Sequence, residues 1–241
     1  VQDGTLTSNS ATSVGHAGFV GANEEGGLIE RCWTSMSVST QSMHAAGFVG
    51  LGYGGTIRNC FALGDVSARG YSGGFVGRSV YDGNIYENCY AAGTVTVTET
   101  EGNGFIGGNQ SWSAFQYDQS SGITNCYYNS STDSSHDYNA VAKSLDEMKS
   151  ADFLAALSGS EAGIWVQSAE KNAGLPYLEG VVAPEQAASS RITVTLVLAA
   201  YDKETYQFSQ LGGDISVTMD STGNTRLVDL MDAAQAQGKL T

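Results

Sequence analysis

One phrase of sequence occurs four times, and it constrains the fold more than any other feature. Its clearest copy reads Gly-Phe-Val-Gly at residues 74–77 and, after a variable loop, Asn-Ile-Tyr-Glu-Asn-Cys-Tyr-Ala-Ala-Gly-Thr-Val at residues 84–95. The Gly-Phe units begin at residues 18, 47, 74 and 104, so they are separated by 29, 27 and 30 residues. A fixed period in this range is typical of repeat architectures.

Each copy consists of short apolar runs that are rich in β-branched residues and end at Gly or Asn, which predicts strands joined by tight turns. One such unit cannot bury its apolar face alone, whereas a stack of units builds a continuous core. At roughly 3.3 Å per residue, about 28 residues are long enough for one complete coil of a solenoid. The sequence therefore predicts an all-β fold whose body, residues 1–130, is a repeat-built β-solenoid similar to a parallel β-helix.

The Asn before Cys in three copies predicts a corner, because Asn tolerates the left-handed backbone conformation. If the alternation of side chains restarts at this corner, small and apolar residues face inward, in the second copy Cys60, Ala62, Gly64 and Val66. The opposite face then carries the aromatic residue that follows each Cys: Trp33, Phe61, Tyr90 and Tyr127. If the alternation does not restart, the two faces exchange and the aromatic residues lie in the core.

The Gly-Phe-Val-Gly unit and its downstream Asn-Cys-Tyr-Ala-x-Gly strand resemble the GLUG repeat of bacterial surface proteins. That repeat is found in large adhesins and in the non-catalytic part of some immunoglobulin-A-cleaving metallopeptidases. The resemblance covers about residues 15–130. The first copy departs from the pattern at Arg31 and Met36, and the fourth replaces the small-residue strand by residues 128–130. Terminal repeats are expected to be atypical because they cap the stack.

Residues 131–180 read as a connector and a small helical cap. Ser144 and Glu147 form a capping box that predicts a helix, and Ser150 predicts the start of a second one. The order of these helices, a lone Trp and an Asn-x-Gly-x-Pro-Tyr-Leu ending resembles the tail that commonly follows GLUG repeats. Because the open end of a stack exposes unpaired backbone, we expect this segment to close that end.

The C-terminal part has a different pattern. Residues 181–190 read as a linker, and residues 191–241 predict two strands, at 192–198 and 214–219, and a helix around 227–234. Two strands followed by a helix resemble the first half of a β-grasp domain, a small α+β fold. We expect residues 191–241 to form part of such a domain.

The charge balance excludes one class of partner. The chain carries 11 Lys and Arg against 25 Asp and Glu, a net charge of −14. Binding to nucleic acid or to an anionic membrane requires clustered basic residues, so neither is expected. No run approaches the ~18 apolar residues of a membrane span. Because the sequence opens at Val1 in mid-pattern, we expect a monomeric fragment of a larger exported protein, extracellular and either secreted or on a bacterial cell surface.

The four cysteines occupy one column of the repeat: Cys32, Cys60, Cys89 and Cys126. An even number in an exported chain suggests disulfides, but stacked equivalents would lie about 4.8 Å apart, beyond the Cβ distance of about 3.8 Å in a disulfide. No CxxC spacing supports zinc. We expect four free, buried thiols.

Catalytic motifs are lacking. There is no HExxH, GxSxG or P-loop. His16 and His44 precede two Gly-Phe units and could lie on adjacent coils, which is at most half a zinc site. Asp65 with Arg69, and Asp82 with Arg78, recur in no column. The segment holding Asp133, His136 and Asp137 lacks calcium-loop spacing. We expect no enzyme activity and no cofactor or metal.

The sequence thus predicts a non-catalytic extracellular adhesion, binding or stalk module that contacts a glycan or protein of a host or neighbouring cell. The expected ligand-binding residues are the four outward aromatics and one residue of the longest loop: Trp33, Phe61, Tyr90, Tyr127 and Trp112. The alternative for the four outward aromatics is that the cap folds back and buries them, and Trp112 could instead close the end of the core. The alternative function is a substrate-positioning region of a secreted hydrolase or peptidase.

Overall fold

The structure is a computed structural model of the whole chain. It describes residues 4–11, 15–80, 83–99, 102–107, 122–134, 136 and 138–184, and, as strands, residues 190–196, 199–202, 207–210 and 215–221. The chain divides into two compact units, Val1–Pro184 and Glu185–Thr241. The division falls inside the stretch 181–190 that the sequence assigns to a linker.

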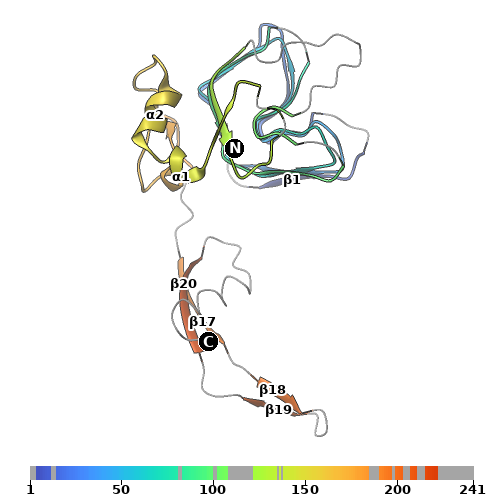
Figure 1. The fold of residues 1–241 in the computed structure, drawn as a ribbon, viewed down its shortest axis with the longest axis vertical. Helices are drawn as coiled ribbons and strands as arrows, with labels where there is room; N and C mark the ends of the chain where they lie inside the picture. Colours follow the sequence, from blue (N-terminus) through green and yellow to red (C-terminus); the bar gives the residue numbers. More distant parts are fainter. Residues whose placement is uncertain are drawn as a thin grey trace. The chain divides into compact units, whose positions relative to one another are not determined.

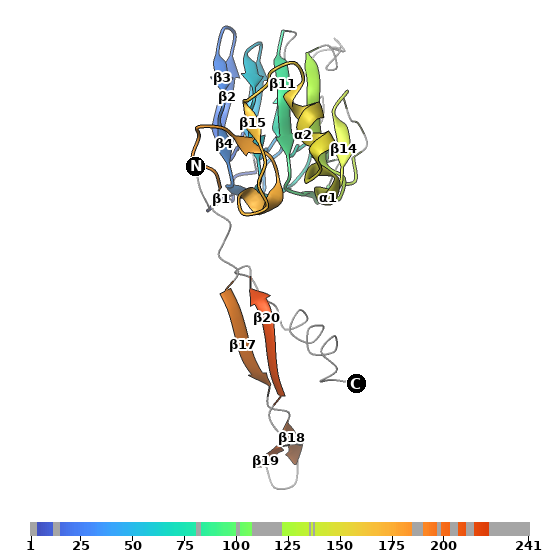
Figure 2. The same ribbon diagram turned by 90° about the vertical axis from the view of Figure 1, so that its left-hand side faces the viewer.

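The first unit is a parallel β-solenoid, as predicted. Figure 1 shows its coils superimposed around one interior, and Figure 2, turned by 90°, shows the strands of successive coils side by side. We call the coils rungs 1 to 4, and they begin at Gly18, Gly47, Gly74 and Gly104. Rungs 1 to 3 each contribute strands to three sheets, which are named here by the residues that characterise them, and rung 4 contributes to one of these sheets.

All three sheets are parallel and in register. The hydroxyl sheet has the order β1 (Thr5–Ser8), β5 (Ser37–Thr40), β9 (Val66–Ala68), β12 (Val95–Val97). The glycine sheet has the order β2 (Val20–Glu24), β6 (Val49–Tyr53), β10 (Val76–Ser79). The cysteine sheet comprises β3 (Leu28–Glu30), β4 (Trp33–Thr34), β7 (Thr56–Arg58), β8 (Phe61–Ala62), β11 (Ile85–Ala91), β13 (Ile123–Asn129) and β14 (Val141–Lys143).

The predicted corner is present in every rung. The residue before each Cys has a positive φ: Arg31, Asn59, Asn88 and Asn125, at 54°, 52°, 52° and 49°. The chain turns at this residue, and the side-chain alternation restarts. Cys60, Cys89 and Cys126 therefore face the interior, which confirms the inward assignment.

Both glycines of the Gly-Phe-Val-Gly unit are required by close backbone contacts between rungs. A Cβ added at Gly47 would overlap the carbonyl oxygen of Gly74, its equivalent in the next rung. A Cβ added at Gly77 would overlap the carbonyl oxygen of His44, which lies at a second left-handed turn with φ 59°. Only glycine allows the backbones to approach so closely.

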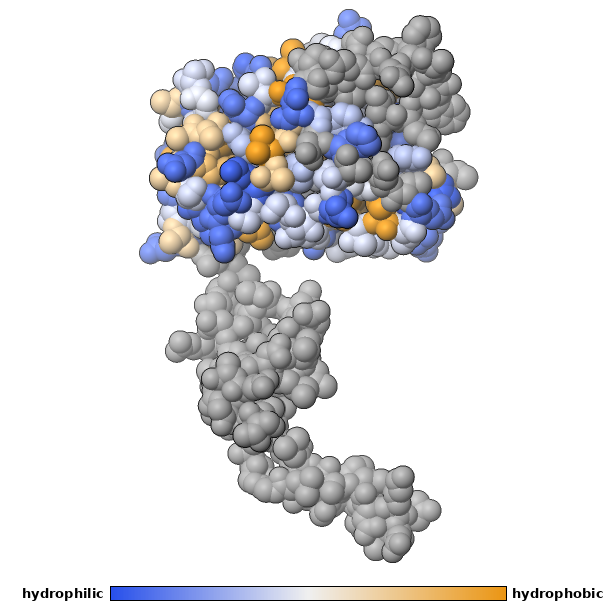
Figure 3. Space-filling view, viewed as in Figure 1, coloured by the Kyte–Doolittle hydropathy of each residue, from blue (hydrophilic) through white to orange (hydrophobic). Residues whose placement is uncertain are grey.

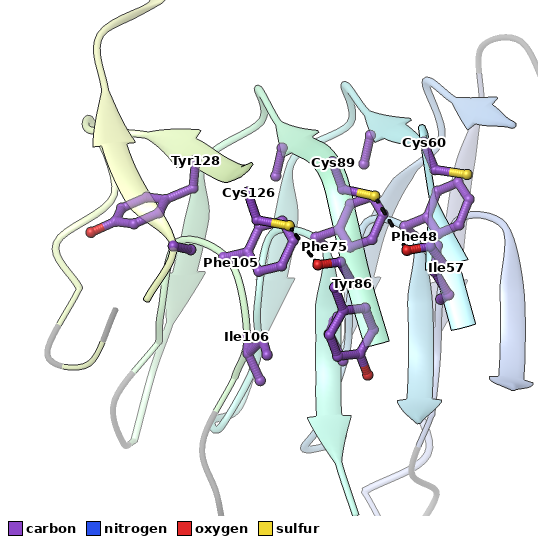
Figure 4. Packing of buried hydrophobic residues seen from close by; sticks show 14 of the residues in the cluster. Phe48, Ile57, Cys60, Phe75, Tyr86, Cys89, Phe105, Ile106, Cys126 and Tyr128 are labelled. Carbon is purple, nitrogen blue, oxygen red and sulfur yellow. Dashed lines mark hydrogen bonds between the residues drawn. The ribbon is translucent and has the colours of Figure 1, made fainter. Parts of the chain in front are cut away.

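The Phe of this unit forms a ladder through the core. The ring centroids of Phe19 and Phe48 are 4.7 Å apart, those of Phe48 and Phe75 are 4.7 Å apart, and those of Phe75 and Phe105 are 5.0 Å apart, all stacked. Figure 4 shows three of these rings in a row beneath Cys60, Cys89 and Cys126. A row of stacked aromatic rings therefore extends through the core along the length of the solenoid.

The cysteines are free thiols, as predicted. Each buried thiol donates to the carbonyl oxygen two residues earlier, as Cys89 does to Glu87 at 3.2 Å. Burial, together with hydrogen bonds to Cys126 and Cys60, raises the pKa of the Cys89 thiol. The expectation of four buried thiols is wrong for Cys32, which is only half-buried, because no described rung precedes rung 1.

The C-terminal end of the solenoid is closed by the end of β13 and by part of the segment that the sequence assigns to a connector. Tyr128, Tyr138 and Ala140 pack against the core, and β14 pairs with β13. The stack therefore continues past residue 130, where the sequence placed its end, to Lys143.

The cap consists of α1 (Leu145–Met148), α2 (Ala151–Ser158), β15 (Trp165–Val166), a 3-10 turn η1 (Asn172–Gly174) and β16 (Tyr177–Leu178). The predicted capping box is present, with the Glu147 N–H donating to Ser144 Oγ at 3.2 Å and the Ser144 N–H donating to the Glu147 carboxylate at 2.8 Å. Ser150 caps α2 as predicted.

The position of the cap differs from the prediction. It lies along the outer flank of the cysteine sheet and not over an end of the stack (Figures 1 and 2). The physical reason is that the flank presents a column of aromatic rings that the cap can bury, whereas Tyr138 and Ala140 already pack against the core at the C-terminal end.

In the second unit, β17 (Ser190–Leu196) pairs antiparallel with β20 (Ile215–Ser221), and β18 (Ala199–Asp202) pairs with β19 (Gln207–Gln210). The two predicted strands are confirmed, with slightly shifted bounds. The helix expected around 227–234 lies outside the described residues, and the β-grasp likeness stays a prediction.

Candidate functional site

The residues that the sequence offers as a binding strip form a continuous column on the outer face of the cysteine sheet. Trp33 pairs in register with Phe61, Phe61 with Tyr90, and Tyr90 with Tyr127. The rings of Trp33 and Phe61 stack with centroids 5.7 Å apart, and those of Phe61 and Tyr90 with centroids 5.1 Å apart. The outward direction of this aromatic column is therefore confirmed.

The aromatic column is nevertheless buried. Phe61 and Tyr90 are 0% exposed, Trp33 is 7% exposed and Tyr127 is 8% exposed. The cap covers them with apolar side chains: Met148, Phe153, Leu157, Trp165, Leu175 and Leu178. The prediction of an exposed ligand-binding strip is wrong, and the alternative that the cap folds back over the column is confirmed.

Two aromatic rings of the cap make the central contacts. Phe153 meets Tyr127 edge-on with centroids 4.9 Å apart and meets Tyr90 edge-on at 6.2 Å. Trp165 lies tilted against Phe61 and Tyr90, each at 5.8 Å. These offset and edge-to-face arrangements are the ones that aromatic pairs prefer.

The polar groups of Tyr90 and Trp33 form hydrogen bonds with the cap and the residues that follow it. The Tyr90 hydroxyl donates to the Pro176 carbonyl oxygen at 2.6 Å and accepts a hydrogen bond from Asn172 Nδ2 at 2.9 Å. Trp33 Nε1 donates to the Val182 carbonyl oxygen at 2.9 Å. Burial raises the pKa of Tyr90, which keeps the hydroxyl protonated as a donor. The polar groups of Tyr90 and Trp33, which could bond a sugar hydroxyl, are thus used within the fold.

The corner asparagines form a second line of contact with the cap. Asn125 Nδ2 donates to Asn88 Oδ1 at 3.0 Å, and Asn88 Nδ2 donates to Asn59 Oδ1 at 3.3 Å. The ladder ends at the cap, where Asn59 Oδ1 accepts from Trp165 Nε1 at 3.2 Å and Asn59 Nδ2 donates to Glu161 at 2.8 Å.

Rung 1 carries Arg31 at this corner instead of Asn. The Arg31 guanidinium reaches the carbonyl oxygen of Glu179 in the cap. The departure from the repeat pattern therefore has a structural reason: the longer side chain anchors the last part of the cap.

The free energy gained by burying the apolar side chains of the cap decides whether the cap could act as a lid. Fully burying a large apolar side chain contributes about 1.5–3 kcal/mol, so six such side chains contribute roughly 10 kcal/mol or more before the entropy of ordering the cap is subtracted. This is comparable to the total stability of a typical domain, about 5–15 kcal/mol. The cap is therefore part of the core of this unit.

The other candidate groups do not converge on a site. Asp65 accepts hydrogen bonds from the Thr94 N–H at 2.8 Å and the Thr94 hydroxyl at 2.9 Å, whereas Arg69 pairs with Glu99 at 3.6 Å. Asp82, Asp137 and Trp112 lie outside the described residues. Over the part of the chain that the structure describes, no three His, Cys, Asp or Glu side chains are grouped so as to hold a metal ion.

His44 is buried, and its ring stacks on Tyr71 with centroids 5.9 Å apart. Burial, and then the positive charge of Arg78, lowers the pKa of His44 to about 4. At neutral pH the imidazole is therefore uncharged. The arrangement is that of a structural histidine at a left-handed turn.

The outer face of the hydroxyl sheet is a regular surface that the cap leaves open. Its central column consists of exposed hydroxyl residues in register: Thr7, Ser39, Ser67 and Thr96. The opposite face of the same strands is apolar, with Val38 and Val66 in the core. Sequence reasoning missed this column, although Ser or Thr recurs one residue after the inward Val in three of the four copies.

Exposed apolar side chains are scattered over the rest of the first unit. The large ones are Leu28, Ile85, Val141, Leu145 and Val182. On the face seen in Figure 3, hydrophobic residues form small groups among hydrophilic ones. Single exposed apolar residues are normal on a soluble surface and mark no site.

A comparison with family models fits this architecture. The model described as the GLUG motif matches residues 41–67. The chain contains a GLUG repeat. The matched residues include β6 to β8 and the first two residues of β9, with the Gly-Phe-Val-Gly unit of rung 2, the Asn59 corner and Cys60. The GLUG resemblance inferred from the sequence is thereby confirmed.

No curated protein and no solved structure matches the chain. Among the residues that the structure describes, no helix is both long enough and apolar enough to cross a membrane.

Proposed function

We propose that the first unit is a non-catalytic, extracellular binding module of a bacterial surface protein, and that it projects sideways from the chain instead of extending it as an in-line stalk. One observation favours the sideways module over the in-line stalk: the chain enters and leaves the solenoid at the same end. β1 is the edge strand of the hydroxyl sheet and precedes rung 1, and the last cap residues contact Trp33 and Arg31 of rung 1.

This path follows from the way the cap returns. The chain winds through the rungs to β14 at the far end, and the cap then runs back from Tyr127 to Trp33. Tension applied between β1 and Pro184 would load the rung 1 end and bypass the other rungs. Such a unit transmits force poorly along its own axis but presents its flank and far end to a partner.

The outer face of the hydroxyl sheet is the surface we assign to that partner, a glycan or protein of a host or neighbouring cell. The flank of the cysteine sheet is covered by the cap, whereas Ser39, Ser67 and Thr96 are exposed on a regular parallel sheet. Short hydroxyl side chains can both donate and accept hydrogen bonds, which suits sugar hydroxyls and backbone groups. The extracellular bacterial setting rests on the resemblance to GLUG-bearing surface proteins.

The test is binding of the full chain to an array of mammalian glycans and to immobilised extracellular glycoproteins. The double variant Ser39→Lys with Ser67→Lys should abolish binding at an unchanged melting temperature. Thr124→Lys is the matched control because Thr124 is exposed on another face, outward from β13, and this variant should bind like the parent.

Three results would count against the proposal. Equal binding by the two Lys variants would remove the hydroxyl sheet as the contact surface. Absence of binding to every glycan and glycoprotein would contradict the binding role. Turnover of a glycan or peptide by the purified chain would contradict the non-catalytic assignment.

A further inference from the structure

The two ends of the solenoid are finished differently. At the C-terminal end, the last members of the inward columns, Phe105, Ile123 and Cys126, are buried in a cluster that also holds Tyr128, Tyr138 and Ala140. At the N-terminal end, the first members of the same columns are only half-buried: Phe19, Ile29 and Cys32. The core is therefore closed at one end and open at the other.

Part of the described backbone of rung 1 is also unpaired on its outer side. Among the described strands, β2 is the edge of the glycine sheet and β3 is the edge of the cysteine sheet, each with one neighbour. An unpaired strand edge next to apolar side chains is a template for adding another strand. Both edges belong to rung 1 and run in the same direction around the coil as the strands they pair with.

We propose that the N-terminal end of the solenoid is a docking surface for one further rung of the same repeat. The surface continues an interface that already exists between rungs 1 and 2, with Phe19 on Phe48 at 4.7 Å, β2 on β6 and β3 on β7. A rung stacked on the open side of rung 1 would bring its own Phe onto Phe19, its aliphatic residue onto Ile29 and its inward small residue onto Cys32.

A second copy of this chain does not fit the surface equally well. Its C-terminal end cannot be presented, because Tyr138 and Ala140 cover the core there and β14 completes the sheet. Its N-terminal end carries the same edges, which would meet β2 and β3 in the antiparallel direction. Antiparallel pairing reverses the order of residues along the strand, so identical columns fall out of register.

The register of the sheets specifies how to build the added rung. Gly4, Met36 and Gly64 occupy one column, because Thr5 pairs with Ser37 and Val38 pairs with Val66. In the extended chain, residues 1–3 are replaced by a second copy of residues 47–63, placed directly before Gly4. This copy would supply new strands to pair with β2, β3 and β4. This follows from geometry alone and does not depend on the binding role proposed above.

Two changes adapt the added copy. The cap ends at Arg31 and Trp33 of rung 1, so it would not cover an outward aromatic residue in the new rung. For this reason the copy carries Phe61→Thr. The copy also carries Cys60→Ala, which leaves Cys32 as the one half-buried thiol among the described cysteines. The labelling rate of Cys32 then reports directly whether the new rung has docked.

The experiment compares the full chain with its extended form, using maleimide labelling of Cys32 and thermal unfolding. Docking should slow Cys32 labelling about tenfold or more, because the thiol then becomes accessible only when the new rung opens. The melting temperature should rise, since each added rung contributes a further interface. The matched control is the same extension with Phe48→Lys and Ile57→Lys in the added copy, which should label like the parent.

Equal protection of Cys32 by both extensions would show unspecific shielding and overturn the proposal. Unchanged labelling and an unchanged melting temperature in the first extension would show that the end accepts no rung. An extended chain that unfolds at a lower temperature than the parent would show the same.

Discussion

The hydroxyl of Tyr90 in rung 3 donates a hydrogen bond to the backbone carbonyl of Pro176 in the cap at 2.6 Å. Asn172 Nδ2 donates to both of these oxygens, at 2.9 Å and 2.8 Å, so the three groups form a closed buried set. A residue whose ring faces outward from the sheet is therefore a core residue of the unit. The same relationship explains why the cap lies on the flank: the flank offers both apolar rings and polar groups that need partners.

The asparagine ladder predicts that two substitutions of Asn88 lower the free energy of unfolding by different amounts. Asn88→Gly removes the hydrogen bonds to Asn59 and from Asn125, which should cost about 1–3 kcal/mol. Asn88→Ala removes the same bonds and also places a residue that disfavours the left-handed conformation at φ 52°. Its free energy of unfolding should therefore be lower than that of Asn88→Gly by about 1 kcal/mol. Urea unfolding followed by tryptophan fluorescence measures both. An alanine variant as stable as the glycine variant would contradict the corner assignment.

His44 predicts a specific pH dependence. Its pKa is about 4 in the folded protein and about 6.5 in an unfolded chain. Between these values the unfolded chain takes up a proton that the folded chain does not. The stabilisation is complete above pH ~6.5 and falls as the pH falls towards ~4, by about 3 kcal/mol in total.

The test of this dependence is the difference between the parent and His44→Asn, since Asn tolerates the left-handed backbone at this position. The free energy of unfolding should fall more steeply between pH ~6.5 and ~4 in the parent than in the variant. Parallel curves over that range would show that folding leaves the pKa of His44 unchanged.

The thiols predict a selective labelling pattern. In the native protein a maleimide should react with Cys32, which is half-buried, and not with the three buried thiols Cys60, Cys89 and Cys126. All four should react after denaturation. Peptide mass spectrometry of the labelled protein identifies each site. Native labelling of Cys89, or a disulfide between any two of the four, would contradict the inward ladder.

The sequence predicts the rungs well because their signals are local and recur. The Asn59 and Asn88 corners follow from a residue type that tolerates positive φ, and the period places Cys60 over Cys89 without knowledge of the fold. Even the outward direction of Phe61 follows from alternation after the corner. These properties depend on neighbours in sequence or on the repeat itself.

The position of the cap could not be predicted in the same way. Its helices follow from Ser144 and Ser150, but the contacts that place it, such as Tyr90 with Pro176, join residues 86 positions apart. Alternation shows which way a side chain points and not what covers it. For the same reason the half-exposure of Cys32 could not be read from its column, since it depends on what lies next to rung 1.

The most direct test of the account is the free energy of unfolding of Tyr90→Ala, with Thr96→Ala as the control from the exposed hydroxyl sheet. A buried large side chain truncated to Ala should cost about 3–5 kcal/mol, whereas the exposed Thr96 should change stability by no more than about 0.5 kcal/mol. Tyr90→Phe, which keeps the ring but loses the hydrogen bonds to Pro176 and from Asn172, should fall between them at about 1–3 kcal/mol. If Tyr90→Ala unfolds like the parent and instead loses glycan or glycoprotein binding, the column is an exposed binding strip and the cap does not cover it.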